Sequence, residues 1–224
     1  MERTDPKRLA AEKAVEYVKN NMVVGLGTGS TAYWAIQAIG EKVRQGLIIR
    51  AVCTSSATEK LAKDLQIPLV TFSATPQLDL AIDGADEIDQ QKALIKGGGG
   101  ALLREKIVAY NSQQFLVIAD ESKLSEKLGR FPLPVEVLPF GVEMTLQHLQ
   151  AICKNAAIRM KNDSPYLTDN GNNIIDCQIE TIPDPEAAQI AIKAIPGVLE
   201  TGLFYALKNC RVIIGYEDGR VEIL

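Results

Sequence analysis

A glycine-rich segment at residues 25–31, GLGTGST, has the residue types needed to bind a phosphate monoester. A glycine turn exposes backbone N–H groups, and a helix beginning there adds about half a positive charge. Ser30 and Thr31 add hydroxyl donors. No lysine follows the glycines as in a Walker A loop, and Ser30 stands where the dinucleotide fingerprint needs glycine. The alternative is a plain tight turn in which Ser30 caps the following helix.

Acidic residues follow a predicted buried strand in the segment 83–89, which reads DGADEID. Carboxylates at a strand end can hydrogen-bond sugar hydroxyls or move protons between oxygens. They can also hold Mg²⁺, which prefers carboxylates together with substrate phosphates. Asp83 and Asp86 are the candidates for these roles. The alternative, a solvated acidic turn, suits Glu87 and Asp89 better than Asp83, which directly follows the strand.

Four consecutive glycines, 97–100, lead from Lys96 into a predicted helix that carries Glu105. Glycine loses more conformational freedom on folding than any other residue, so such a run favours a backbone that closely approaches a ligand. On a helical wheel Glu105 lies on the small apolar stripe of Ala101 and Val108. A partly buried carboxylate there would serve as a general base. The alternatives are a Glu105 that only complements the helix dipole and a Lys96 that is only a surface charge.

Three further candidates have weaker signals. The hydroxyl residues 54–56 follow the next strand along the chain and could line a ligand crevice, but capping of a helix over 57–65 is the favoured interpretation. Lys123 comes just past another predicted strand and points either into the crevice or into water. Lys7, in the first predicted helix, is similarly ambiguous.

The elements that must position these residues alternate between strands and helices. Helices are predicted over 6–20, 31–45, 56–65 and 101–110. Strands are predicted over 22–26, 48–53, 68–72, 78–82, 93–95 and 115–119. Nearly continuous apolar strands between helices indicate an α/β fold with a mostly parallel sheet, whose strand carboxyl ends converge on one ligand-binding edge.

The pattern changes near Leu128, where the stiff segment FPLP at 131–134 begins a different kind of region. Strands over 135–138, 157–160 and 173–180, helices over 141–153 and 184–194, and hairpin chemistry at 169–172 predict a small α+β domain. A terminal hairpin over 211–216 and 220–223 is expected to return to the first domain. The predicted domains are therefore 1–128 with 204–224, and 129–203.

Composition narrows the function. The 224 residues include 24 basic and 28 acidic ones, a net charge of −4, so no basic surface for nucleic acid is expected. No apolar run is long enough to span a membrane, and the N-terminus does not read as a signal peptide. Four cysteines without a Cys-x-x-Cys pair, and one histidine, form no recognisable metal motif. We expect a cytoplasmic protein without a metal or cofactor.

Taken together, these residue types favour proton transfer next to the carbonyl of a small phosphorylated polyol. That reaction needs a carboxylate base, a positively polarised site for the enediolate oxygen, and exclusion of water. Two other classes stay open. A sugar-phosphate sensor or transferase of similar fold would keep the glycine segment and could dispense with Glu105. An interaction protein on the same scaffold would not need Glu105 on an apolar stripe.

The chain resembles ribose-5-phosphate isomerase, type A, in co-linear motifs that extend over nearly its whole length. The matching segments are GLGTGST (25–31), TSSAT (54–58), DGADEID (83–89), KGGGGALLREKI (96–107), DESK (120–123), LGRFPLPVEVLP (128–139), LTDNGN (167–172) and IPGVLETGLF (195–204). The resemblance implies a Rossmann-like α/β domain with a smaller α+β domain, assembled as a homodimer or homotetramer.

The same resemblance implies metal-free interconversion of D-ribose 5-phosphate and D-ribulose 5-phosphate through an enediolate, in the non-oxidative pentose phosphate pathway. Glu105 would shuttle the proton between C1 and C2, Asp83 would move protons between the sugar oxygens, and Lys96 would help to stabilise the enediolate. The implied substrate-binding residues are Thr28, Gly29, Ser30, Thr31, Asp83, Gly84, Ala85, Asp86, Lys96, Gly97, Gly98, Gly99, Lys123 and, for the phosphate, Lys7.

Overall fold

The computed structural model describes residues 5–75 and 77–224, and the chain divides into two compact units. The first contains the described residues up to Ala85, together with Arg104–Lys123 and Leu207–Leu224. The second comprises Asp86–Leu103 and Leu124–Ala206. The stretch 86–103, which the sequence pattern placed in the first domain, groups with the second unit because its two short strands pair there. Residues 1–4 of the predicted first domain lie outside the described residues.

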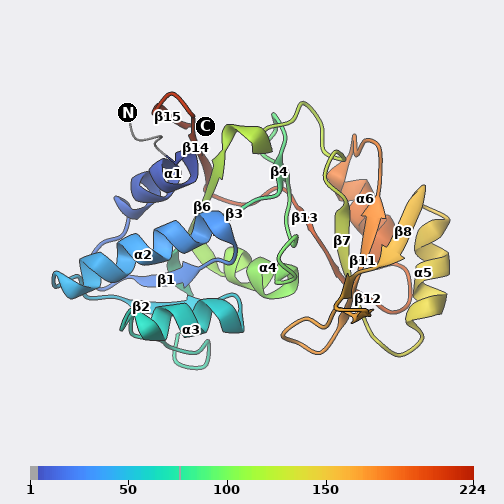
Figure 1. Ribbon diagram of the computed structural model, residues 1–224, viewed down its shortest axis with the longest axis horizontal. Coiled ribbons are helices and arrows are strands. Elements are labelled where there is room, and N and C mark those ends of the chain that lie inside the picture. Colours follow the sequence, from blue (N-terminus) through green and yellow to red (C-terminus); the bar gives the residue numbers. More distant parts are fainter. Residues whose placement is uncertain (1–4, 76) are drawn as a thin grey trace. The chain divides into compact units, whose positions relative to one another are not determined.

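A six-stranded sheet forms the centre of the first unit (Figure 1). Its strands are β1 (Val23–Leu26), β2 (Arg50–Cys53), β3 (Leu78–Gly84), β6 (Ser112–Asp120), β14 (Cys210–Gly215) and β15 (Val221–Ile223). They lie in the order β15-β14-β6-β3-β1-β2, and every neighbouring pair is parallel except β14 and β15. This mostly parallel sheet confirms the predicted α/β class, and the terminal hairpin joins it as expected.

Helices accompany these strands. They are α1 (Pro6–Val15), α2 (Ser30–Arg44), α3 (Ser56–Asp64), α4 (Leu102–Tyr110) and the short 3₁₀ helix η1 (Glu121–Lys123). Pro6 occupies the first turn of α1, where its missing N–H costs nothing, and the Asp5 carboxylate accepts the Lys7 N–H at 2.9 Å. The helix ends at Val15 rather than at residue 20, because tighter turn bonds such as Tyr17 N–H to Ala14 O follow it.

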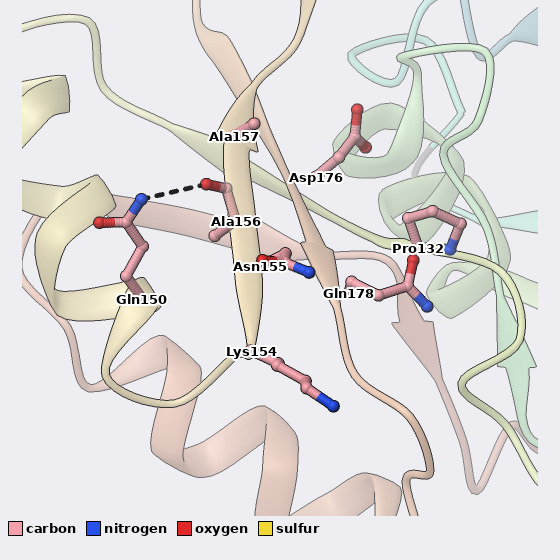
Figure 2. Close-up of a pocket in the computed structure, with 8 residues that line it drawn as sticks. All are labelled: Pro132, Gln150, Lys154, Asn155, Ala156, Ala157, Asp176 and Gln178. Carbon is pink, nitrogen blue, oxygen red and sulfur yellow. Dashed lines mark hydrogen bonds between the residues drawn. The ribbon is translucent and has the colours of Figure 1, made fainter.

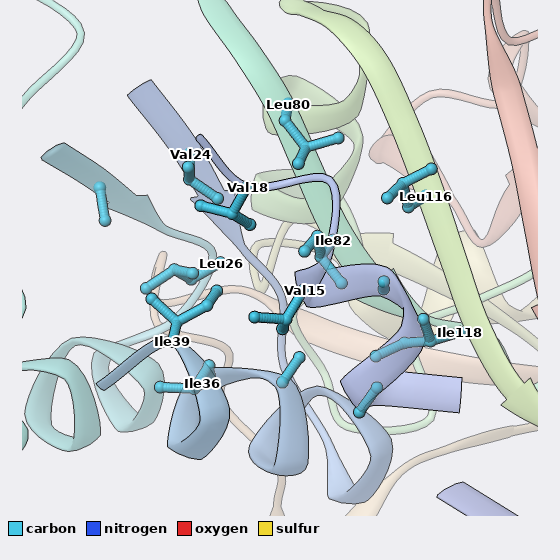
Figure 3. Packing of buried hydrophobic residues seen from close by; sticks show 14 of the residues in the cluster. Val15, Val18, Val24, Leu26, Ile36, Ile39, Leu80, Ile82, Leu116 and Ile118 are labelled. Atoms are coloured by element: carbon cyan, nitrogen blue, oxygen red, sulfur yellow. The ribbon is translucent and has the colours of Figure 1, made fainter. Parts of the chain in front are cut away.

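Alternation along the strands sends side chains to both faces of the sheet. Leu26 and Ile82 pack with Ile36 and Ile39 of α2 in a buried apolar cluster (Figure 3). Gly25 lies on the opposite face of the sheet, where an added Cβ would be 2.4 Å from Val108 Cγ1 of α4. Glycine at this position therefore lets α4 approach the sheet closely. One predicted strand, 68–72, is only an isolated bridge between Leu69 and Ala51.

The second unit contains a four-stranded antiparallel sheet in the order β12-β7-β11-β8, a three-stranded sheet β13-β5-β4 and a ribbon β10-β9. The strands are β4 (Glu87–Ile88), β5 (Leu94–Ile95), β7 (Leu133–Val137), β8 (Asn155–Ile158), β9 (Met160–Lys161), β10 (Ser164–Pro165), β11 (Asn173–Gln178), β12 (Val198–Thr201) and β13 (Leu203–Phe204). The helices are α5 (Val142–Gln150) and α6 (Pro185–Lys193). Val135, Ile175, Leu149 and Ile192 share one buried cluster, as expected of an α+β domain.

No helix among residues 5–75 and 77–224 combines the length and the apolar character that crossing a bilayer requires.

Candidate functional site

The glycine turn, residues 27–31, connects β1 to α2 and is held by Asp83 at the end of β3. A Cβ on Gly27 would lie 2.1 Å from Asp83 Oδ1 and 2.6 Å from Asp83 Cα, so only glycine fits. Asp83 is 2% exposed, and its Oδ1 accepts the N–H groups of Thr28 at 3.0 Å and Gly84 at 2.7 Å. The predicted candidate Asp83 therefore fixes the backbone of the predicted phosphate turn.

The start of α2 has the properties of an anion site. Gly29 is the N-cap residue, with φ 113°, and no side chain caps the helix. The alternative in which Ser30 caps the helix is wrong, because Ser30 is already the first helical residue. The first N–H groups of an uncapped helix, with its dipole, attract anions. Lys7 Nζ donates to Ser30 Oγ at 3.2 Å, so the structure places this lysine at the turn.

A cluster of four hydroxyl residues supports the turn from β2 and α3. The Thr28 hydroxyl lies 2.7 Å from Thr54 Oγ1, 2.8 Å from Ser55 Oγ and 3.1 Å from Thr58 Oγ1. Thr58 in turn donates to Gly27 O at 2.8 Å. Thr58 gives its proton to Gly27 O and Thr54 donates to Leu26 O at 3.1 Å, so the single Thr28 proton is the one that bonds Ser55 Oγ. Thr28 therefore shapes the turn.

The favoured interpretation of residues 54–56 is confirmed in part. Ser55 accepts the Thr58 N–H at 3.1 Å and so caps α3. This cap also supports the glycine turn through Thr58, a role that was not predicted. The motif TSSAT carried the signal, since hydroxyl residues three and four apart share a helix face.

The remaining first-unit candidates lie on α4, at the end of β3 and on η1. Glu105, in the first turn of α4, is 4% exposed, and Val108 beside it on the helix is also buried, which confirms the predicted apolar stripe. Gly84 ends β3 and Ala85 follows it. A Cβ on Gly84 would lie 3.9 Å from Thr31 Cβ, so the end of β3 lies next to the start of α2. Lys123 is half-buried at the end of η1.

In the second unit Lys96 is a buried cation. It is 2% exposed, so the surface-charge alternative is wrong. Its Nζ lies 5.5 Å from the centroid of the Phe204 ring, within range of a cation–π attraction, and its N–H donates to Gly202 O at 2.9 Å. A buried lysine is a stronger electrostatic partner for a negative oxygen than a lysine in water.

The glycine run, residues 97–100, forms a tight turn after Lys96. Gly98 N–H donates to Asp86 Oδ2 at 2.7 Å, and Gly100 N–H to Gly97 O at 2.9 Å. A Cβ on Gly97, where φ is 99°, would lie 2.8 Å from Leu102 Cβ. The structure thus brings together Asp86, Lys96 and the glycine run, all of them predicted candidates.

Two residues that the sequence analysis missed also hold this run. Arg159 and Tyr166 donate hydrogen bonds to its carbonyl groups. Burial raises the pKa of the Tyr166 phenol, and Asp169 raises it further, so this hydroxyl stays a neutral donor. Neither residue lies in a recognisable motif, because each is defined only by the tertiary contact.

Glu87 corrects another expectation. It is fully buried rather than part of a solvated turn, and it accepts the N–H groups of Gly129 and Phe131, both at 3.0 Å. It therefore anchors the segment that leads into β7. Asp89 fits the predicted acidic turn, since it accepts the Gln91 N–H at 2.9 Å.

A pocket of about 450 Å³ lies in the second unit beside β8 (Figure 2). Its lining residues are Pro132, Gln150, Lys154, Asn155, Ala156, Ala157, Asp176 and Gln178. The predicted site residues do not line it. Gln150 donates to Ala156 O at 3.2 Å, and Lys154 pairs with Glu180. These two polar side chains therefore make contacts within the protein.

In the first unit, a parallel sheet with an uncapped helix and a buried carboxylate at its strand ends is the kind of place where open α/β folds bind phosphorylated ligands. The family model described as ribose 5-phosphate isomerase A (phosphoriboisomerase A) matches residues 50–219. The chain therefore belongs to the ribose 5-phosphate isomerase A family.

Individual relatives agree. The ribose-5-phosphate isomerase A of Bacillus mycoides (strain KBAB4) is 51% identical over 217 residues, which cover 96% of this chain and 98% of that protein. A solved D-ribose-5-phosphate isomerase in complex with phospho-erythronic acid is 39% identical, with a TM-score of 0.94 over 99% of both chains. The enzyme of Plasmodium falciparum is 40% identical, with a TM-score of 0.93 over 97% of both chains.

Proposed function

We propose that this chain interconverts D-ribose 5-phosphate and D-ribulose 5-phosphate through an enediolate. The observation that carries the proposal is Glu105, a carboxylate buried in the first turn of a helix, in a chain that belongs to this isomerase family. A carboxylate in a position that excludes water is suited to act as a general base.

The phosphate end is assigned to the glycine turn. The N–H groups at the start of α2, the hydroxyls of Ser30 and Thr31, and the Lys7 ammonium supply donors and positive charge for a phosphate dianion. Thr28 contributes the shape of the turn, because its hydroxyl packs against those of Thr54 and Thr58 and donates to Ser55.

The chemistry is assigned to three side chains. The Glu105 carboxylate takes the proton from C2 of the aldose and returns it to C1 of the enediolate. Asp83 moves the hydroxyl proton between O2 and O1, so that the C1 aldehyde becomes an alcohol and the C2 alcohol a ketone. Lys96 stabilises the negative oxygen that develops between these two steps. Gly84, Ala85, Asp86, the glycine run and Lys123 complete the proposed substrate-binding set.

We also propose that the chain acts in the cytoplasm as a homodimer or homotetramer, with no nucleic-acid or membrane partner. Family resemblance and the acidic charge balance support this. Size-exclusion chromatography with light scattering would measure the mass of the assembly. A monomer at the protein concentration used in the activity assay would contradict the proposed homodimer or homotetramer.

The isomerase assignment is tested by incubating purified protein with ribose 5-phosphate and measuring ribulose 5-phosphate. Unphosphorylated ribose serves as the control substrate, since it lacks the group that the glycine turn binds. We expect turnover only with the phosphorylated sugar. Binding without turnover would instead assign the chain to sugar-phosphate sensing.

A further inference from the structure

Arg159, which follows β8 in the second unit, contacts the glycine run with its guanidinium group. Its Nη1 donates to Gly97 O and to Gly98 O, both at 3.0 Å. Its Nε donates to Asp176 Oδ2 at 2.8 Å, and its Nη2 to the other oxygen of that carboxylate. The Arg159 side chain is 16% exposed. A carboxylate on one edge thus holds the guanidinium while the other end grips two consecutive carbonyl groups.

Tyr166 extends this contact by one residue. Its hydroxyl donates to Gly99 O at 3.3 Å, and the Arg159 guanidinium carbon lies 5.9 Å from the ring centroid. A Cβ on Gly100 would lie 2.3 Å from the Tyr166 hydroxyl oxygen, so the ring sits where only glycine leaves room. The carbonyl groups of Gly97, Gly98 and Gly99 therefore all turn toward this pair.

The direction of the carbonyl groups fixes the direction of the N–H groups. In a trans peptide the N–H of the next residue points opposite to the C=O. Because Gly97 O faces Arg159, Gly98 N–H points away from it, and this N–H meets Asp86 Oδ2 at 2.7 Å. By the same geometry the bond between Arg159 and Gly98 O turns the exposed Gly99 N–H away from Arg159.

We propose that Arg159 is a positioning residue, which aims the Gly99 N–H at the substrate oxygen that becomes negative in the enediolate. The inference rests on the proposed isomerase function. Oriented N–H donors are effective at such an oxygen because they need no reorganisation during the reaction. Arginine is required here, since its planar fork can hold Asp176 bidentately and still reach two carbonyls, which an ammonium group cannot do.

The test compares Arg159→Met and Arg159→Lys with Lys154→Met, a matched control just before β8 whose lysine pairs with Glu180. We expect Arg159→Met to lower kcat about 10- to 100-fold, as misplacement of a catalytic donor does, with KM changed less than about threefold. Arg159→Lys should recover only part of kcat, and Lys154→Met should behave as wild type.

Two inhibitors separate positioning from a general loss of structure. Inorganic phosphate probes the glycine turn, and phospho-erythronic acid adds a carboxylate in place of the reacting end. Arg159→Met should weaken inhibition by phospho-erythronic acid about tenfold and leave inhibition by phosphate unchanged, in line with the loss of one oriented donor. Equal weakening of both inhibitors, or an unchanged kcat, would overturn the inference.

Hydrogen exchange across residues 97–101 separates this inference from the isomerase assignment. Faster exchange in Arg159→Met than in Lys154→Met supports the positioning role, whether or not the wild-type protein turns over ribose 5-phosphate. Unchanged exchange overturns it. An inactive wild-type protein would instead overturn the proposed function.

Discussion

The glycine turn and the glycine run are both short glycine segments, yet they are held in different ways. Asp83 and a cluster of four hydroxyl residues fix the turn, and all of these partners lie at strand ends or helix starts of the same parallel sheet. Asp86 holds the run on one side, while Arg159 and Tyr166 hold it on the other. Parallel topology by itself thus assembles the first segment, whereas the second depends on a separate antiparallel unit.

The largest effect should come from a residue that belongs to neither glycine segment. Glu105→Gln keeps the size of the buried side chain but removes the base, so kcat should fall about 10³-fold, within the range of general-base catalysis. Inhibition by inorganic phosphate should stay unchanged, since the turn is intact. Glu12→Gln, an exposed change on α1, is the matched control. Near-normal turnover of Glu105→Gln would exclude this residue as the base.

The next largest effect is a difference in stability between alanine variants of the two glycine segments. A Cβ on Gly27 meets both the side chain and the backbone of Asp83, so Gly27→Ala should lower the free energy of unfolding by about 3 kcal/mol, as overpacking does. A Cβ on exposed Gly98 meets only the Asp86 carboxylate, at 2.7 Å, which can move. Gly98→Ala should therefore cost less than about 1 kcal/mol of stability while lowering kcat.

Urea unfolding of the two variants, read beside their kcat values, measures this difference. Equal losses of stability would show that the two glycine segments are equally constrained and would remove the contrast between them.

This contrast also explains how far the sequence could be interpreted without coordinates. The β–turn–α pattern predicted the parallel sheet, and motif position alone pointed to Asp83 and Glu105. Arg159 and Tyr166 could not be found this way. They follow β8 and β10, and their contacts with the glycine run depend on the tertiary placement of these strands. Glu87 was misjudged for the same reason: the N–H groups that bury its charge come from Gly129 and Phe131, more than forty residues later.

A smaller effect should follow from the hydroxyl cluster. Thr28→Val keeps the shape of the side chain but removes its hydrogen bond to Ser55, while Thr54 and Thr58 keep their bonds to Leu26 O and Gly27 O. This change should cost about 0.5–1.5 kcal/mol of unfolding free energy. Because the turn is the proposed phosphate site, KM should rise more than kcat falls. Thr71→Val, at an exposed hydroxyl, is the control. A larger change in kcat than in KM would instead give the Thr28 hydroxyl a role in the chemistry.

The smallest expected effect, none at all, tests whether the acidic residues of both segments hold a metal. Asp83 Oδ1 already accepts two backbone N–H groups, and Asp86 Oδ2 accepts the Gly98 N–H at 2.7 Å. These bonds tie one oxygen of each carboxylate to the backbone of a glycine segment, and the described residues contain no group of three or more His, Cys, Asp or Glu that could hold a metal ion. Treatment with EDTA should therefore leave kcat unchanged. A loss of activity that Mg²⁺ restores would show that these carboxylates bind a cation, and their backbone contacts would then describe the metal-free form alone.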